Sequence, residues 1–86
     1  MLNYNYRMVS EVMKINGNLL KSKRALYDLT QKNIAETIGT TEKTYNHKEQ
    51  GKVDFKPNEI ISISNKLKLT LEDINQIFFD GNLPIV

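Results

Sequence analysis

Five polar side chains recur within one short stretch of the sequence, at a spacing that places them on one side of a helix. They occur at intervals of one and three residues: Glu42, Lys43, Asn46, His47 and Gln50. This spacing fits one face of a helix with 3.6 residues per turn. Their hydrogen-bond donors and acceptors suit the edges of nucleic-acid bases and phosphate groups. An ordinary solvated helix face has the same composition, so both interpretations stay open on this pattern alone.

The sequence lacks the residues that most catalytic or metal sites need. Cys is absent and His47 is the one histidine among 86 residues, which excludes disulfides, cysteine-ligated zinc and a cysteine nucleophile. His47 has no catalytic partner at a plausible spacing, and no glycine-rich phosphate loop or cluster of metal ligands is present in the sequence. We therefore expect a protein that is not an enzyme, with no catalytic residue, no metal and no cofactor.

Length and composition fit one small globular domain. The chain has 12 Lys and Arg against 10 Asp and Glu, and 40% of its residues are hydrophobic, as in folded rather than disordered proteins. No stretch approaches the ~20 apolar residues of a membrane span, and the N-terminus lacks a signal-peptide pattern. We expect a cytoplasmic protein without membrane contact. Between Lys21 and Lys52 there are seven basic and four acidic residues, so a small positive excess surrounds the polar face.

Capping residues divide the middle of the chain into two short helices joined by a tight turn. Thr30 is placed to cap a helix over residues 31–38, and Gly39 to end it in a left-handed conformation. Thr41 is placed to cap a second helix, from residue 42 to about residue 50, which leaves about three residues for the turn. The side chains expected to point inward from this unit are Ile34, Ala35, Ile38, Thr44 and Tyr45, together with Thr41.

Three further helices are expected around this pair, which predicts an all-α fold of five helices. The first begins after Asn18 and ends near Asp28, the fourth has Pro57 in its first turn, and Thr70 with Asp73 forms a capping box for the last. The fourth helix is expected to have a broad apolar face, formed by Ile60, Ile61, Ile63, Ser64 and Leu67.

The two ends of the chain fit this pattern least well. Residues 1–17 mix an alternating polar and aromatic stretch with a loose helical spacing, and we interpret them as an N-terminal extension that frays. Residues 80–86 contain a turn signal and then an apolar tetrapeptide, and we interpret them as a short C-terminal tail. The folded domain is predicted to cover residues 18–79.

Several short motifs along residues 18–79 carry a resemblance to a known family. They are Leu20-Lys21-Ser22-Lys23-Arg24, Leu29-Thr30-Gln31, Ile34-Ala35, Ile38-Gly39-Thr40-Thr41 and Glu49-Gln50-Gly51-Lys52. Together they resemble the DNA-binding domains of the Xre/Cro-type family, to which phage repressors, Cro proteins and many small bacterial regulators belong. The resemblance implies a lambda-repressor-like fold with a helix-turn-helix, whose second helix lies in the major groove. It implies sequence-specific binding to an operator in double-stranded DNA and a role as a small transcriptional regulator, a repressor.

The resemblance also implies roles for single residues. Gln31 matches a position that hydrogen-bonds the phosphate backbone and sometimes a base, and Thr41 matches a backbone contact at the start of the recognition helix. Asn46 is expected to reach a flanking phosphate. The positions that match the main base-reading residues are Glu42, Lys43 and His47. Further phosphate contacts are implied for Lys52, Lys21 and Lys32. Lys43 and His47 are expected to determine specificity, while the role of Glu42 stays open because only a cytosine amino group favours a carboxylate.

Two positions concern how the second helix of the pair is held. Arg24 and Glu49 match an ion pair that joins the first helix to the end of the third in the family. Lys48 stands where an apolar residue often completes the core. Either its methylene stem packs and its amine reaches solvent, or the end of this helix is looser.

Apolar residues accumulate in the last helix and the tail beyond what a closed core needs. These residues are expected to form a homodimer interface: Ile77, Phe78, Phe79, Leu83 and Ile85. Family members usually bind pseudo-palindromes as dimers, with half-sites about 34 Å apart. Two alternatives remain open. The protein is an antitoxin or accessory regulator that also binds a protein partner, or it is a protein-interaction module that has lost DNA binding, for which Glu42 and the modest net charge speak.

Overall fold

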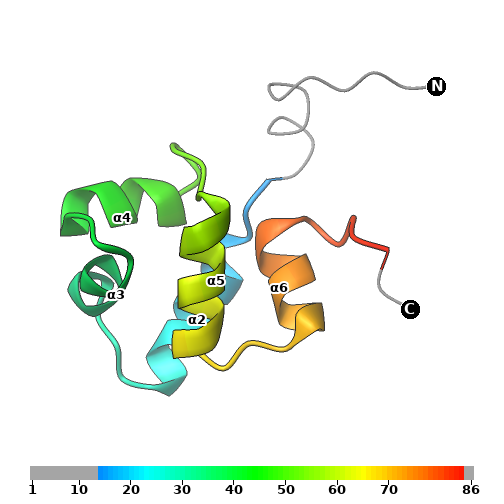
Figure 1. The fold of residues 1–86 in the computed structure, drawn as a ribbon, viewed down its shortest axis with the longest axis horizontal. Helices are drawn as coiled ribbons and strands as arrows, with labels where there is room; N and C mark the ends of the chain where they lie inside the picture. The colour runs from blue at the N-terminus through cyan, green and yellow to red at the C-terminus, as the bar shows by residue number, and fades with distance from the viewer. Residues whose placement is uncertain (1–13, 85–86) are drawn as a thin grey trace.

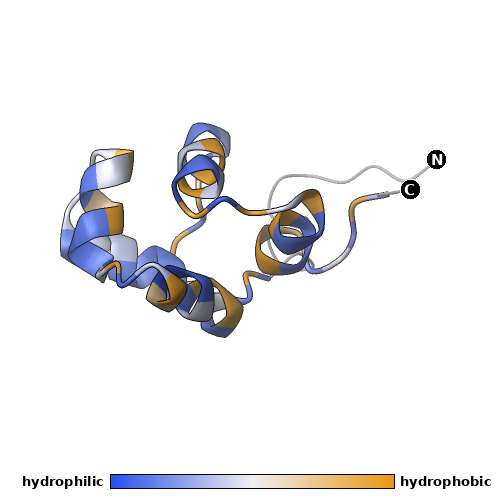
Figure 2. Cartoon of the chain, turned by 90° about the horizontal axis from the view of Figure 1, so that it is seen from below, coloured by the Kyte–Doolittle hydropathy of each residue, from blue (hydrophilic) through white to orange (hydrophobic). Residues whose placement is uncertain are grey.

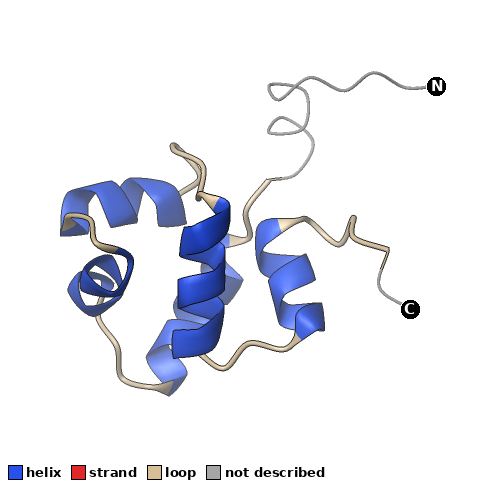
Figure 3. Ribbon diagram, viewed as in Figure 1, coloured by secondary structure: helices blue, strands red, loops and turns tan. Residues whose placement is uncertain are grey.

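The computed structural model describes residues 14–84, which form five helices joined by short loops (Figure 1). In chain order they are α2 (Gly17–Leu26), α3 (Gln31–Ile38), α4 (Glu42–Glu49), α5 (Pro57–Lys66) and α6 (Leu71–Phe78). Residues 14–84 contain no strand (Figure 3), so the predicted all-α fold is confirmed. Most of the predicted N-terminal extension, residues 1–13, and Ile85 of the predicted dimer interface lie outside the described residues.

Three threonines cap helices as predicted. The Thr30 hydroxyl accepts a hydrogen bond from the Asn33 backbone N–H at 3.0 Å, and the Asn33 side chain accepts one from Thr30 in return. Thr41 and Thr70 accept the corresponding bonds at the starts of α4 and α6, both at 3.1 Å. Gly39 ends α3 with φ 73°. These local bonds satisfy orphan backbone groups and fix where each helix begins and ends.

The first helix begins and ends earlier than predicted. Asn16 caps it by accepting a hydrogen bond from the Leu19 N–H at 3.1 Å, so α2 starts at Gly17. The Asn16 backbone N–H also donates to the Ile77 carbonyl at 2.7 Å, and Ile15 packs against the core. The residues just before α2 therefore belong to the folded unit.

All five helices contribute to one core. Its buried members are Leu20, Ile34, Ala35, Tyr45, Ile63, Leu67, Ile77 and Phe78. Phe55, from the connector between α4 and α5, lies between two core aromatics, with ring centroids 6.0 Å from Tyr45 and 5.3 Å from Phe78. The helices α2, α3, α5 and α6 each carry both hydrophilic and hydrophobic residues (Figure 2), as expected for helices that bury one face. Helix α4 has no aliphatic residue and contributes the ring of Tyr45 to the core.

Two predictions about inward-facing residues are wrong. Ile61 is 62% exposed, because the buried side of α5 follows the spacing of Ile60, Ile63 and Leu67 and leaves Ile61 at its edge. Thr41 is exposed and Thr44 half-buried, since both take part in the cap of α4 rather than in the core. Of the three residues expected to point inward from this helix and its cap, Tyr45 alone is fully buried.

Candidate nucleic-acid interface

The first turn of α4 is the most exposed part of that helix. Glu42 and Lys43 are exposed, whereas Asn46 and His47, one turn later, are half-buried. The helices α3 and α4 lie at the end of the molecule opposite α6 (Figure 1). Three of the predicted phosphate contacts are also exposed: Lys21 on α2, Lys32 on α3 and Lys52 in the loop after α4. The lysine side chains are therefore accessible to a large ligand.

The opposite side of α4 is held by the Glu49 carboxylate, which accepts four hydrogen bonds from three side chains. Arg24 donates through Nε at 3.2 Å and Nη2 at 3.1 Å, the Tyr45 hydroxyl donates at 2.5 Å, and Gln31 Nε2 donates at 3.1 Å. The predicted ion pair between Arg24 and Glu49 is thus present, and it is largely buried, with side-chain exposures of 11% and 6%. Arg24 Nη1 also donates to the Leu29 carbonyl at 2.9 Å.

Burial and hydrogen bonding act against each other in this network. Burial raises the pKa of Glu49, but the hydrogen bonds from Arg24, Tyr45 and Gln31 outweigh it and hold the pKa below its usual value. Burial lowers the pKa of Arg24, and the pairing with Glu49 more than compensates. Burial, together with the bond to Glu49, raises the pKa of Tyr45. At neutral pH the network contains a carboxylate, a guanidinium and a neutral phenol.

Lys48 takes neither of the two arrangements expected from the sequence. It is 5% exposed, and its ammonium neither reaches solvent nor loosens the helix, because Nζ donates to Glu59 on α5 at 2.6 Å. Glu59 is 8% exposed and also accepts from the Lys56 backbone N–H at 2.9 Å. Burial raises the pKa of Glu59, and the bonds from Lys48 and Lys56 bring it below its usual value. Because Lys48 and Glu59 are eleven residues apart, no local sequence signal connected them.

A chain of three side-chain amides extends from Glu49 to the surface. Gln31 Nε2, which donates to Glu49, also donates to Asn46 Oδ1 at 3.0 Å. Gln50 Nε2 donates to the same Asn46 oxygen at 3.2 Å. The sequence predicted Gln31 and Asn46 as two separate backbone contacts to DNA. The structure brings the two side chains together, and Gln31 is half-buried.

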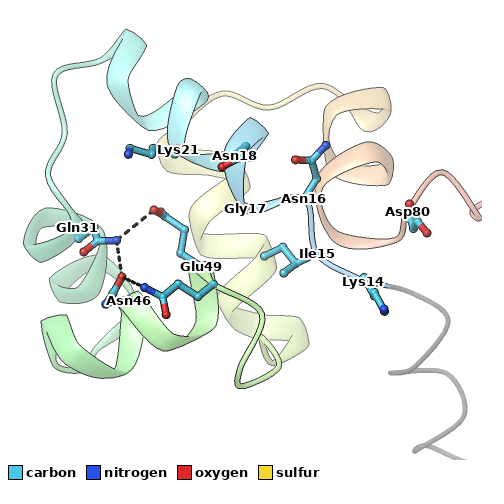
Figure 4. A pocket seen from close by; sticks show the side chains of 11 residues that line it. Lys14, Ile15, Asn16, Gly17, Asn18, Lys21, Gln31, Asn46, Glu49 and Asp80 are labelled. Carbon is cyan, nitrogen blue, oxygen red and sulfur yellow. Dashed lines mark hydrogen bonds between the residues drawn. The ribbon is translucent and has the colours of Figure 1, made fainter.

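These amides border an open pocket of about 660 Å³ between the start of α2, the start of α3 and the end of α4 (Figure 4). Lys21, Gln31 and Asn46 lie along one side of it, and Lys14 and Asp80 lie on the other. Gly17 forms part of its floor, where a Cβ atom would overlap the Glu49 carbonyl oxygen. Of the predicted DNA contacts, the pocket brings together Lys21, Gln31 and Asn46, while the others lie outside it.

The prediction of a dimer interface is wrong for two of its residues. Ile77 is fully buried and Phe78 is 7% exposed, since both complete the core of a single chain. Phe79 is half-buried against the same core, and Leu83 is 36% exposed. Asn75 fixes the tail: its Oδ1 accepts from the Leu83 N–H at 2.9 Å, and its Nδ2 donates to the Leu83 carbonyl at 3.4 Å.

Other kinds of site find no support within residues 14–84. No group of three or more acidic, histidine or cysteine side chains gathers there in a way that could hold a metal ion. None of the described helices has the length and apolarity needed to cross a bilayer. Every buried side-chain nitrogen and oxygen in this part of the chain has a hydrogen-bond partner.

These features define a small all-α domain with a polar surface on α4 and a buried ionic network behind it. The chain belongs to the family described as protein of unknown function (DUF739), which matches residues 4–81. Searches of curated proteins and of solved structures gave no match.

Proposed function

We propose that this protein is a small transcriptional regulator that binds double-stranded DNA sequence-specifically and acts as a repressor. The observation that carries the proposal is the α3–α4 unit, in which a three-residue turn joins two eight-residue helices. Both the lengths and the turn fit a helix-turn-helix of the lambda-repressor-like type that the sequence resembles. The second helix, α4, has exposed polar side chains, and two buried ion pairs hold its opposite side against α2 and α5, as a DNA-recognition helix requires.

In this proposal the exposed side chains on the first turn of α4 read base edges. Lys43 can donate to guanine, and Glu42 can accept from the amino group of cytosine. His47, one turn further along, is half-buried and approaches the groove from the same helix. Lys21, Lys32 and Lys52 neutralise phosphates on either side.

The contact proposed for Thr41 requires an exchange of hydrogen bonds. Its hydroxyl donates to Thr44 Oγ1 at 3.0 Å and accepts from the Thr44 N–H. A phosphate that takes the Thr41 hydrogen replaces the bond to Thr44, whereas the cap itself is retained. We therefore expect a smaller contribution from Thr41 than from the exposed lysines.

A homodimer on a pseudo-palindromic operator is part of the proposal, with a smaller interface than the sequence suggested. The exposed apolar side chains near α6 are Leu71, at 71%, and Leu83, at 36%. Helix α6 and the segment that follows it lie at the opposite end of the molecule from α3 and α4 (Figure 1).

The second candidate function is binding of a protein partner, either beside DNA binding, as in an antitoxin or accessory regulator, or in place of it. It is favoured by apolar side chains that a monomer leaves exposed, namely Leu26 at 72%, Ile61 at 62% and Leu71 at 71%.

The test is a salt titration of binding to random-sequence duplex DNA, followed by selection of the bound sequences. DNA binding predicts that the logarithm of the affinity falls by ~0.9 per logarithmic unit of salt for each phosphate contact. A two-fold symmetric motif among the selected sequences is expected for a dimer. Absence of binding at low salt contradicts the proposal and directs the search to a protein partner.

Three alanine variants sharpen this test. Lys43→Ala and His47→Ala should relax base preference, with a loss of about 1–3 kcal/mol for the preferred sequence. Lys52→Ala should weaken all sequences alike and lower the salt slope by about one. If all three behave like Lys52→Ala, the assignment of base-reading residues is wrong.

A further inference from the structure

The side chains of Gln31, Asn46 and Gln50 form a chain of hydrogen bonds in which each amide has a fixed role as donor or acceptor. The Glu49 carboxylate, at the buried end of this chain, determines these roles. A carboxylate can only accept hydrogen bonds, so the atom of Gln31 that faces Glu49 is its NH₂ nitrogen. That nitrogen has two hydrogens, and it donates to both Glu49 Oε1 and Asn46 Oδ1. The atom of Asn46 that faces Gln31 must then be its oxygen. This order needs no choice between amide orientations, because it is imposed from the buried end.

Gln50 is the last amide of this chain of hydrogen bonds, at its exposed end. Its Nε2 donates to Asn46 Oδ1, so this oxygen accepts two hydrogen bonds and both of its lone pairs are used. The Asn46 Nδ2 group takes part in neither bond, and Figure 4 shows it pointing away from Gln31. Both hydrogens on Gln31 Nε2 are likewise used within the protein.

We propose that Glu49 fixes the polarity of the Gln31–Asn46–Gln50 chain, so that Asn46 offers the DNA two donors and no acceptor. This inference rests on the proposed function and gives Asn46 a defined specificity. It also makes Gln31 a positioning residue, because its side chain has no hydrogen left for a phosphate.

The consequence concerns which groups Asn46 can recognise. An Asn that reads adenine uses its oxygen for the N6 amino group and its nitrogen for N7. Asn46 lacks a free oxygen lone pair, so this bidentate pairing is closed to it. Guanine O6 and N7, thymine O4 and phosphate oxygens offer acceptors only, and they match what Asn46 presents.

The first test needs no DNA. In ¹⁵N-labelled protein, exchange of side-chain amide hydrogens with water is measured by NMR for the three residues. The Gln31 hydrogens should exchange about fivefold more slowly than those of Asn46, because one hydrogen bond contributes about 1 kcal/mol. Slow exchange at Asn46 and fast exchange at Gln31 would mean the opposite polarity and would overturn the inference.

The second test compares selected DNA sequences for the wild type and Asn46→Ala. At any base pair where this substitution relaxes the preference, the base that Asn46 contacts should be guanine or thymine and not adenine. If Asn46 binds phosphate, all sequences weaken alike. We expect a loss of affinity of about tenfold in either case. Where that pair is A·T, replacing its adenine by 7-deazaadenine removes N7 and should leave the affinity of the wild type unchanged, whereas a loss of about tenfold would show that Asn46 pairs with adenine and would overturn the inference.

A third variant separates a recognition role from a structural one. The double substitution Gln31→Leu with Gln50→Leu removes both donors to Asn46 Oδ1 and leaves Asn46 in place. Asn46 can then pair bidentately with adenine, so an A·T pair should become acceptable at this position, and 7-deazaadenine in that pair should weaken binding by the double variant but not by the wild type. An unchanged preference in a variant that folds and binds contradicts the proposed control by the amide chain. If the wild type binds no duplex, the proposed function fails, whereas the exchange measurement still decides the polarity.

Discussion

Two adjacent residues of α4 form buried ion pairs with different surroundings. Lys48 pairs with Glu59 on α5, whose carboxylate also accepts a backbone N–H from Lys56. Glu49 pairs with Arg24 on α2, and its carboxylate continues through Gln31 and Asn46 to the surface. The hydrogen bonds of the Lys48–Glu59 pair stay in the interior, whereas those of the Arg24–Glu49 pair extend to the polar side chains on the surface of α4. Similar burial therefore does not imply a similar role.

The largest expected effect comes from removing Glu49. Glu49→Ala leaves the Arg24 guanidinium and the Tyr45 hydroxyl buried without their acceptor, and we expect a loss of about 3–5 kcal/mol in the free energy of unfolding. Urea denaturation followed by circular dichroism measures it. Glu42→Ala, which removes an exposed carboxylate from the same helix, is the matched control and should change stability by less than about 1 kcal/mol. Equal losses in the two variants would contradict the role given to the network.

A substitution at Gly17 tests the close backbone contact between α2 and the end of α4. A Cβ atom there would overlap the Glu49 carbonyl oxygen, so Gly17→Ala must push α2 away from the end of α4. We expect a loss of about 1–3 kcal/mol, although Ala favours helix more than Gly does. Thermal unfolding of this variant is compared with that of Asn18→Ala, which changes an exposed neighbour. A more stable Gly17→Ala protein would show that the two helices are not in close contact.

Acid should weaken both pairs. The pKa values of Glu49 and Glu59 lie below their usual values in the folded protein, and so does that of Asp73, which accepts from the Thr70 N–H. Their contribution to stability is full above the unfolded pKa of about 4 and is lost as the pH falls through the lower folded values. The melting temperature should therefore be nearly constant from pH 7 to about pH 5 and then decline. A melting temperature that rises on acidification would contradict these directions.

The smallest effect is expected when both residues of the Lys48–Glu59 pair are replaced. Lys48→Met with Glu59→Gln removes two buried charges, keeps similar volumes and retains an oxygen for the Lys56 N–H. We expect stability within about 1.5 kcal/mol of the wild type and almost unchanged DNA affinity, as judged by denaturation and by the salt titration. Strong loss of DNA binding in a stable double variant would show that this pair also influences the interface.

The predicted features that the structure confirms are those with local signals. Thr30, Thr41 and Thr70 act within one helical turn of themselves, so their capping roles could be predicted from the sequence.

The features that escaped prediction depend on distant partners. Glu59 joins α4 from another helix, and Gln31 lies fifteen residues from Asn46. Ile77 and Phe78 look like surplus apolar residues until the packing of α6 on α2 and α5 buries them. The Arg24–Glu49 pair was found through the family resemblance, since no spacing rule relates residues 25 positions apart.

The pairing of Asn75 with the Leu83 backbone has a practical consequence for labelling and fusion experiments. A chain shortened before Leu83 leaves a buried amide side chain without either partner, so it should be less stable than one that retains residue 83. A fluorophore or affinity tag attached after residue 84 keeps both bonds and starts from the end of the molecule away from α3 and α4 (Figure 1). Such a reporter can follow binding at α4 without occupying the surface under study.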